Sequence, residues 1–120
     1  MAFGYLRLAD AVHLDVTGTD AVTIYANPSG KTTYIRSIII HNVNTTTETV
    51  TLYIVADNAS SEGADSDTTN RFYKEDLPAG STRILEFPAP GIMLVDQNDT
   101  LQGACTTHEK VLVWAYGGQE

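Results

Sequence analysis

The chain has 120 residues, a single cysteine, and fifteen acidic against seven basic residues, which gives a formal net charge of −8. A chain of this length suits one domain that buries a core without disulfides, and the lone Cys105 excludes a disulfide within the chain. The acidic balance excludes the basic surface that nucleic-acid binding needs, and no apolar run approaches the ~18 residues of a membrane span. We therefore expect neither nucleic acid nor a membrane as a partner.

The N-terminal segment, residues 1–20, is less regularly patterned than the rest of the chain. It carries four large apolar side chains near its start, Phe3, Tyr5, Leu6 and Leu8. This is more apolar surface than a solvated tail requires. We expect residues 1–20 to form either a first strand or an N-terminal arm that packs on a neighbouring protein, and residues 21–118 to form the folded domain.

A period of two residues runs through most of the chain from residue 21 onwards, which is typical of half-buried strands. The predicted strands are 21–26, 32–42, 47–56, 71–75, 82–87, 100–104 and 110–116. Turn residues such as Asn, Pro and Gly separate them, and no stretch shows a helical apolar stripe with caps. The pattern predicts an all-β protein, a single-domain antiparallel β-sandwich that is jelly-roll-like and has eight to nine short strands.

The predicted strand 32–42 is apolar on both faces. Strict alternation places Ile35 and Ile39 on one face, and Ile38 and Ile40 on the other. Two partly apolar faces indicate a central strand, or a strand with one face covered by a partner.

The predicted strand 47–56 has a polar but uncharged outer face of threonine and tyrosine, with Tyr53 as its largest side chain. A flat, uncharged sheet surface suits packing against protein, either a partner or a second sheet of the same sandwich. The candidate protein-contact residues are therefore Phe3, Tyr5, Leu6, Leu8, Ile38, Ile40 and Tyr53.

The acidic loop 57–70 contains no apolar residue larger than alanine. A loop of this length in a small domain is functional or disordered, and we expect it to be exposed to solvent. Glu62, Asp65 and Asp67, with Asp57 nearby, could supply oxygen ligands to Ca²⁺, although the residue order of an EF-hand is absent.

The remaining motifs do not combine into a catalytic site. Gly30-Lys31 lacks the earlier glycine of a phosphate-binding loop and precedes a strand rather than a helix. Cys105 and His108 form one possible ligand pair, but a zinc site needs further ligands, and no base accompanies the thiol. Trp114 lies in an apolar strand and is interpreted as a core residue. We expect no catalytic residues, no metal, no cofactor and no enzymatic activity.

Several segments together carry a resemblance to a known class of protein. They are residues 28–42, 47–53 and 77–87, followed by Gly91-Ile92, a polar turn and a closing Val-x-Val-Trp strand. This layout, over roughly residues 21–116, resembles small all-β virion proteins encoded in the structural gene blocks of tailed bacteriophages. The resemblance implies a structural role in the virion.

Within that class, the resemblance favours a capsid decoration (cement) protein that stabilises the major capsid lattice. It implies synthesis in the cytoplasm of the host bacterium and a final place on the capsid exterior. The implied partners are the major capsid protein or another virion protein, and further copies of the chain, with a trimer favoured. Strand addition from an N-terminal arm, residues 2–14, is the expected mode of attachment.

Two alternatives stay open. The first is a neck, tail or fibre-base component of the same virion. The second is a lectin-like module that binds carbohydrate or a receptor, with Ca²⁺ held by the acidic loop 57–70.

Overall fold

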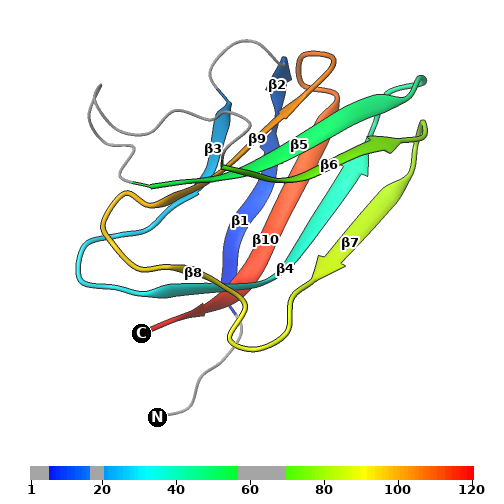
Figure 1. Cartoon of the computed structure of the whole chain (residues 1–120). Helices are drawn as coiled ribbons and strands as arrows, with labels where there is room; N and C mark the ends of the chain where they lie inside the picture. The colour runs from blue at the N-terminus through cyan, green and yellow to red at the C-terminus, as the bar shows by residue number, and fades with distance from the viewer. Residues whose placement is uncertain (1–5, 17–20, 57–69) are drawn as a thin grey trace.

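A computed structural model describes residues 6–16, 21–56 and 70–120. These residues form ten strands: β1 (Leu6–His13), β2 (Asp15–Val16), β3 (Val22–Ala26), β4 (Thr33–Asn42), β5 (Glu48–Val55), β6 (Arg71–Leu77), β7 (Thr82–Glu86), β8 (Ile92–Leu94), β9 (Thr100–Cys105) and β10 (Val111–Gln119). The strands lie in two layers that pack face to face (Figure 1). No helix able to cross a membrane occurs within the three described ranges.

The strand order is that of a jelly roll. The first sheet has the order β1-β10-β4-β7, and β8 also pairs with β4. The second has the order β2-β9-β5-β6, and β3 also pairs with β9. Neighbouring strands are antiparallel except for the two-residue contact of β2 with β9. The predicted jelly-roll-like sandwich is thus confirmed, and the shortest strands, β2 and β8, have only two and three residues.

The hydrophobic core lies between the two sheets. Its fully buried side chains include Ile35, Ile38 and Ile40 of β4, Val111 and Val113 of β10, Val50 and Leu52 of β5, and Leu101 of β9. These residues come from the four central strands of the two sheets. Each fully buried aliphatic side chain contributes about 1.5–3 kcal/mol relative to solvent exposure, so the core is the main source of stability.

The N-terminal segment is part of the sandwich from residue 6 onwards. β1 is an edge strand that pairs with β10, with Ala9 opposite Ala115. Ala9 is 7% exposed, and Leu14, just after β1, is fully buried in the core. The expectation of a separable arm over residues 2–14 is therefore wrong for residues 6–14, because removing them would open the core. Phe3 and Tyr5 lie outside the described residues.

β4 does not alternate strictly, because it contains a β-bulge. The pairing of β4 with β10 shifts by one residue at Arg36. An extra residue reverses the phase of a strand, so Ile35 joins Ile38 and Ile40 in the core. Ile39 is left on the outer face, away from Ile35. The prediction that Ile35 and Ile39 share one face of the strand is thus wrong.

The part of the outer face of the second sheet that β5 and β9 form is also buried. Tyr53, Val55 and Ala104 form a second apolar cluster with the partly buried Ala21. Beside it, Thr100 Oγ1 donates a hydrogen bond to the Val55 carbonyl at 3.0 Å. The uncharged face predicted for this strand exists, but the chain itself covers it.

Candidate functional site

The described part of the chain holds no group of three His, Cys, Asp or Glu side chains that could bind a metal ion. The three carboxylates considered for Ca²⁺, Glu62, Asp65 and Asp67, lie outside the described residues, as does all of the acidic loop but Asn70.

The structure separates Cys105 from His108. The Cys105 thiol is buried and donates to the Thr107 carbonyl at 3.0 Å. His108 is exposed, and its Nδ1 lies 2.8 Å from Asp15 Oδ1. The hydrogen bond to the Asp15 carboxylate raises the pKa of His108. The two side chains therefore belong to different surroundings and do not form a ligand pair or a nucleophile and base.

Cys105 is expected to be unreactive in the native protein. Burial, with a further contribution from the nearby Glu48 carboxylate, raises the pKa of its thiol to about 11. Because the thiolate is the reactive form, a disulfide reagent such as DTNB should label it rapidly only after unfolding in guanidinium chloride. Rapid labelling of the folded protein at neutral pH would contradict the buried placement of the thiol.

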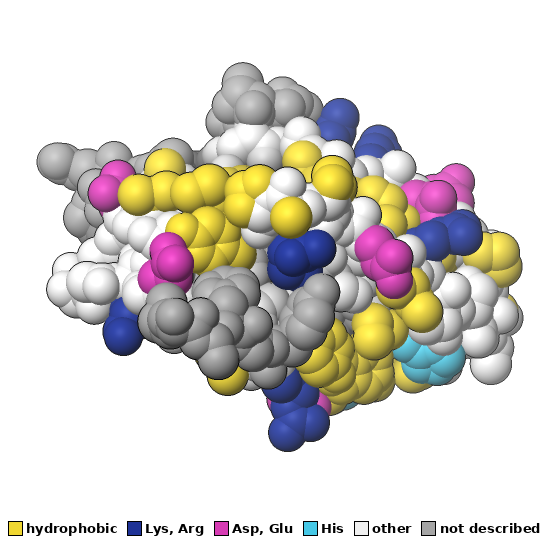
Figure 2. All heavy atoms as spheres, turned by 90° about the horizontal axis from the view of Figure 1, so that it is seen from below, with side chains coloured by type: hydrophobic (Ala, Val, Ile, Leu, Met, Phe, Trp, Pro, Cys, Tyr) yellow, Lys and Arg dark blue, Asp and Glu magenta, His cyan; other side chains and the backbone are white. Residues whose placement is uncertain are grey.

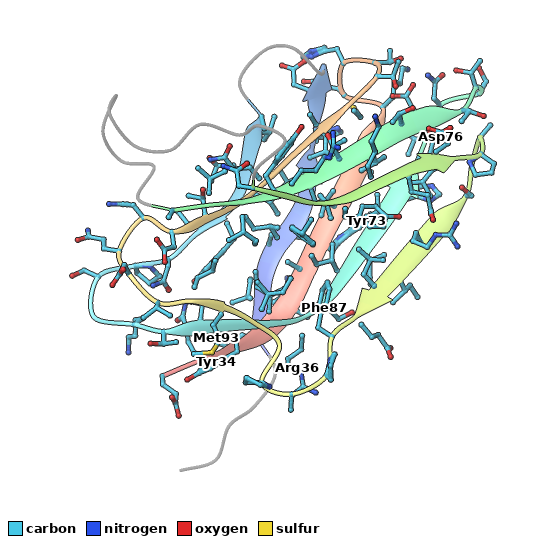
Figure 3. The ribbon with its side chains drawn as sticks, viewed as in Figure 1. Tyr34, Arg36, Tyr73, Asp76, Phe87 and Met93 are labelled. Atoms are coloured by element: carbon cyan, nitrogen blue, oxygen red, sulfur yellow. The ribbon has the colours of Figure 1, made fainter. Side chains whose placement is uncertain are left out.

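One end of the sandwich carries a hollow of about 300 Å³, lined by Tyr34, Arg36, Ala89, Pro90 and Glu120. The Tyr34 hydroxyl donates to Glu120 Oε2 at 2.8 Å, and Arg36 Nε donates to the Phe87 carbonyl at 3.2 Å. Figure 3 shows Tyr34 and Arg36 at the lower end of the sandwich, near Met93 and the connection that leads to β8. These contacts tie the last residue and the turn after β7 to β4.

A charged cluster joins the two sheets at the β6 and β7 edges. Arg83 Nε lies 2.5 Å from Glu75 Oε1, and the Tyr73 hydroxyl donates to the same oxygen at 3.0 Å. Burial and the Glu75 carboxylate raise the pKa of Tyr73 to about 12. Because Glu75 and Arg83 come from different sheets, the cluster closes one side of the sandwich.

The outward side of the sheet β1-β10-β4-β7 is uncharged and apolar at its centre, and we call it the open face. Trp114 of β10 pairs with Ile39 of β4, and Ile39 pairs with Ile84 of β7, so the three side chains form one cross-strand row. Ile84 is 58% exposed, while Ile39 and Trp114 are half-buried. Such a row is suited to burial against protein.

A second row lies beside the first on the open face. Leu112 of β10 pairs with His41 of β4, and His41 pairs with Thr82 of β7. His41 Nδ1 lies 2.8 Å from Thr82 Oγ1. This contact links β4 to β7 on the open face, and neither of its two side chains is a carboxylate.

The third row carries a guanidinium group at one end and a carboxylate group at the other. Arg7 pairs with Tyr116, Tyr116 with Ser37, and Ser37 with Glu86. A cation thus stands at the β1 edge and an anion at the β7 edge. Arg7 Nη1 lies 3.9 Å from Asp10 Oδ1, but both side chains are about 60% exposed, and an ion pair of this kind contributes little.

A hollow of about 280 Å³ opens within the open face, and Ile39, His41, Thr82, Trp114 and Tyr116 line it. Apolar walls with a few polar groups are typical of ligand pockets. Seen from below the sandwich (Figure 2), hydrophobic side chains gather along one margin next to a histidine, and charged side chains are scattered between such groups.

Most of the predicted contact residues do not lie on an exposed surface. Ile38 and Ile40 are fully buried between the sheets, and Tyr53 is 8% exposed within the second apolar cluster. Leu8 packs against the core, whereas Leu6 is 47% exposed. The prediction that Ile38, Ile40 and Tyr53 contact a partner protein was therefore wrong. The bulge in β4 leaves Ile38 and Ile40 in the core, and Tyr53 is buried within the chain itself.

The sequence pattern missed Trp114 as a surface residue. It stands between Val113 and Ala115, which are both buried, so alternation alone would have placed it on the outer face. Its size and its apolar neighbours instead favoured the core.

No family model, curated protein or solved structure matches this chain. Any function assigned to it rests on the open face and on the residues themselves.

Proposed function

We propose that this chain is a non-enzymatic structural protein of a tailed-bacteriophage virion, and specifically a capsid decoration protein on the capsid exterior. The observation that carries the proposal is the open face, an uncharged row of Trp114, Ile39 and Ile84 on a sheet whose core is complete without it. A subunit of an assembly needs such a surface to bury against its neighbours in the particle.

Two further features support the proposal. The jelly roll is a fold that viral capsid proteins use, although lectins use it too. The net charge of −8 gives the rest of the surface an acidic character, which suits a protein that faces solvent on the outside of a particle.

The copy number of the chain in purified particles tests this proposal. Quantitative mass spectrometry should find it in a ratio near one to one with the major capsid protein, or at one oligomer for each lattice joint. About a dozen copies or fewer would overturn the decoration role and move the protein to the neck, tail or fibre base. Absence from the particles would overturn the virion role.

A short deletion tests the N-terminal contribution to attachment while β1 is kept whole. Deletion of residues 2–5 removes Phe3 and Tyr5 but none of the ten strands of the described residues, whereas deletion of residues 2–12 also removes most of β1. If the first residues attach the protein to the capsid, the shorter deletion should lower its occupancy on particles while thermal unfolding stays unchanged. Full occupancy would exclude this mode of attachment.

The hollow in the open face favours one alternative function, the binding of a carbohydrate. Trp114 and Tyr116 offer aromatic surfaces for a sugar ring, and His41 and Thr82 offer hydrogen-bonding groups beside them. A glycan array should then give a signal that Trp114→Ala removes. No signal on the array would exclude the alternative for the glycans displayed.

A further inference from the structure

We propose that the open face binds the open face of a second copy of this chain, around a two-fold axis that runs parallel to the strands. The proposal deepens the proposed function by naming an occupant of the same surface, and it rests on that function in requiring the open face to be buried against protein. The argument comes from the order of side chains across the three rows.

The charges at the two edges of the open face make it complementary to itself. The third row begins with Arg7 on β1 and ends with Glu86 on β7, with only Tyr116 and Ser37 between them. Within one copy, Arg7 makes only a long, exposed ion pair of 3.9 Å with Asp10, which contributes little, and Glu86 lies on the opposite edge strand, where Arg7 cannot pair with it. A second copy whose strand order runs the opposite way across the sheet places its Glu86 opposite Arg7 and its Arg7 opposite Glu86.

A two-fold axis parallel to the strands produces this arrangement. It places each row of one copy over the same row of the other with the strand order reversed, so that β1 faces β7 and β10 faces β4. Arg7 then faces Glu86 of the second copy, and the contact occurs twice. In the central row, Trp114 faces Ile39 of the second copy.

An axis across the strands does not produce it. β1 would then face β1 of the second copy, and the row that carries Arg7 and Glu86 would face the row of His41 and Thr82. Arg7 and Glu86 would then not face each other across the two copies. The position of the charges therefore selects one of the two symmetric arrangements.

The area of the face indicates a reversible dimer. Four strands about 4.8 Å apart, with about five residues of 3.4 Å each, give a face of roughly 19 by 17 Å. Two such faces bury roughly 650 Å² in total, which is below the ~1,200 Å² of a standard specific interface and fits only a weak, transient contact. We therefore expect a dimer that dissociates at concentrations on the order of hundreds of micromolar, within the upper part of the range tested below.

Charge reversal offers a test specific to this symmetry. In Arg7→Glu, two anions face each other at both contacts, and in Glu86→Arg two cations do, so each variant alone should dimerise at least about tenfold more weakly than the original protein. When the two variants are mixed, both contacts pair a carboxylate with a guanidinium. The mixture should form a one-to-one heterodimer of nearly the original affinity.

Sedimentation velocity from about 5 to about 500 µM would measure these equilibria on purified protein. Lys74→Glu, which makes the same charge change on β6 of the second sheet, is the matched control and should leave the dimer unchanged. Ile84→Glu should give a folded monomer, because Ile84 is exposed and its removal leaves the core intact. Thermal unfolding by circular dichroism verifies the fold of each variant.

A monomer at the highest concentration, or a trimer, would overturn the proposal. So would a dimer that neither charge reversal weakens, or single variants that their mixture does not rescue. None of these results uses phage particles. A dimer that is absent from particles would therefore refute the virion role and support the pairing of open faces. A monomer found in many copies on capsids would refute the pairing and support the virion role.

Discussion

Replacing Gly117 with alanine should destabilise the protein by roughly 3–5 kcal/mol, near the upper end of single substitutions. Gly117 of β10 pairs with Ile35 at the bulge of β4, where the two backbones approach closely. A Cβ atom at Gly117 would lie 1.8 Å from the carbonyl oxygen of Tyr34 and 2.9 Å from its carbonyl carbon. Both atoms belong to the backbone of a central strand, so the new methyl group forces β10 and β4 apart.

Urea unfolding, followed by tryptophan fluorescence and circular dichroism, would measure this loss. Gly30→Ala is the matched control: its φ is +74°, and no atom lies within 4 Å of the added Cβ. The control should therefore lose only about 1–2 kcal/mol, the cost of a left-handed backbone conformation for alanine. Equal losses in the two variants would show that the backbones can separate at Gly117 without penalty.

Replacing Glu48 with alanine should cost about 2–4 kcal/mol at neutral pH. Its side chain is fully buried. One carboxylate oxygen accepts a hydrogen bond from the Thr107 amide at 2.8 Å, and the other accepts one from Asn44 Nδ2 at 3.0 Å. Glu48 thus holds the turn before β5 against the turn between β9 and β10. The alanine variant leaves the Thr107 amide without its acceptor.

The effect of Glu48 should depend on pH. Burial opposes its charged form, but the hydrogen bonds from Thr107 and Asn44 outweigh burial and lower its pKa below the ordinary value of 4.5. Its ionised form therefore contributes stability that is fully present above about pH 4.5 and is lost as the pH falls through the lower native pKa. Chemical unfolding at several pH values should show that the difference in free energy of unfolding between the original protein and Glu48→Ala becomes smaller as the pH falls below about 4.5.

Glu86→Ala is the control for this pH experiment, because Glu86 is exposed on the β7 edge. It should change the free energy of unfolding by no more than about 0.5 kcal/mol. If the free energy of unfolding lost in Glu48→Ala stayed constant from pH 7 to below pH 4, the negative charge of the carboxylate would not contribute to stability.

The strands were predictable because each carries its own local signal. In β5, Val50 and Leu52 alternate with polar residues, and the pattern alone places them in the core, where they lie. The hairpin turn at residues 77–80, between β6 and β7, follows from its proline and glycine. These features depend on residues close together in the chain.

The open face was not predictable in this way, because it depends on the register between distant strands. Residues 39, 84 and 114 come from three strands that are far apart in the sequence. The bulge at Arg36 determines which isoleucines of β4 face outwards, and a bulge depends on the pairing with β10 rather than on β4 alone. The prediction that Tyr53 lies on an exposed face was wrong for a related reason. Alternation correctly placed it on the outer side of β5, but that side is buried around Val55 and Ala104.

The sequence by itself therefore determined the fold class, the approximate strands, and the exclusion of a basic nucleic-acid-binding surface, since each follows from composition or from short-range alternation. Only the tertiary structure decided that residues 6–13 complete a sheet, that Ile38 and Ile40 are internal, and that Trp114 faces solvent beside Ile39. The physical reason is that a strand's pattern distinguishes its two faces but does not say which face the rest of the molecule covers. Long-range pairing and sheet packing make that choice.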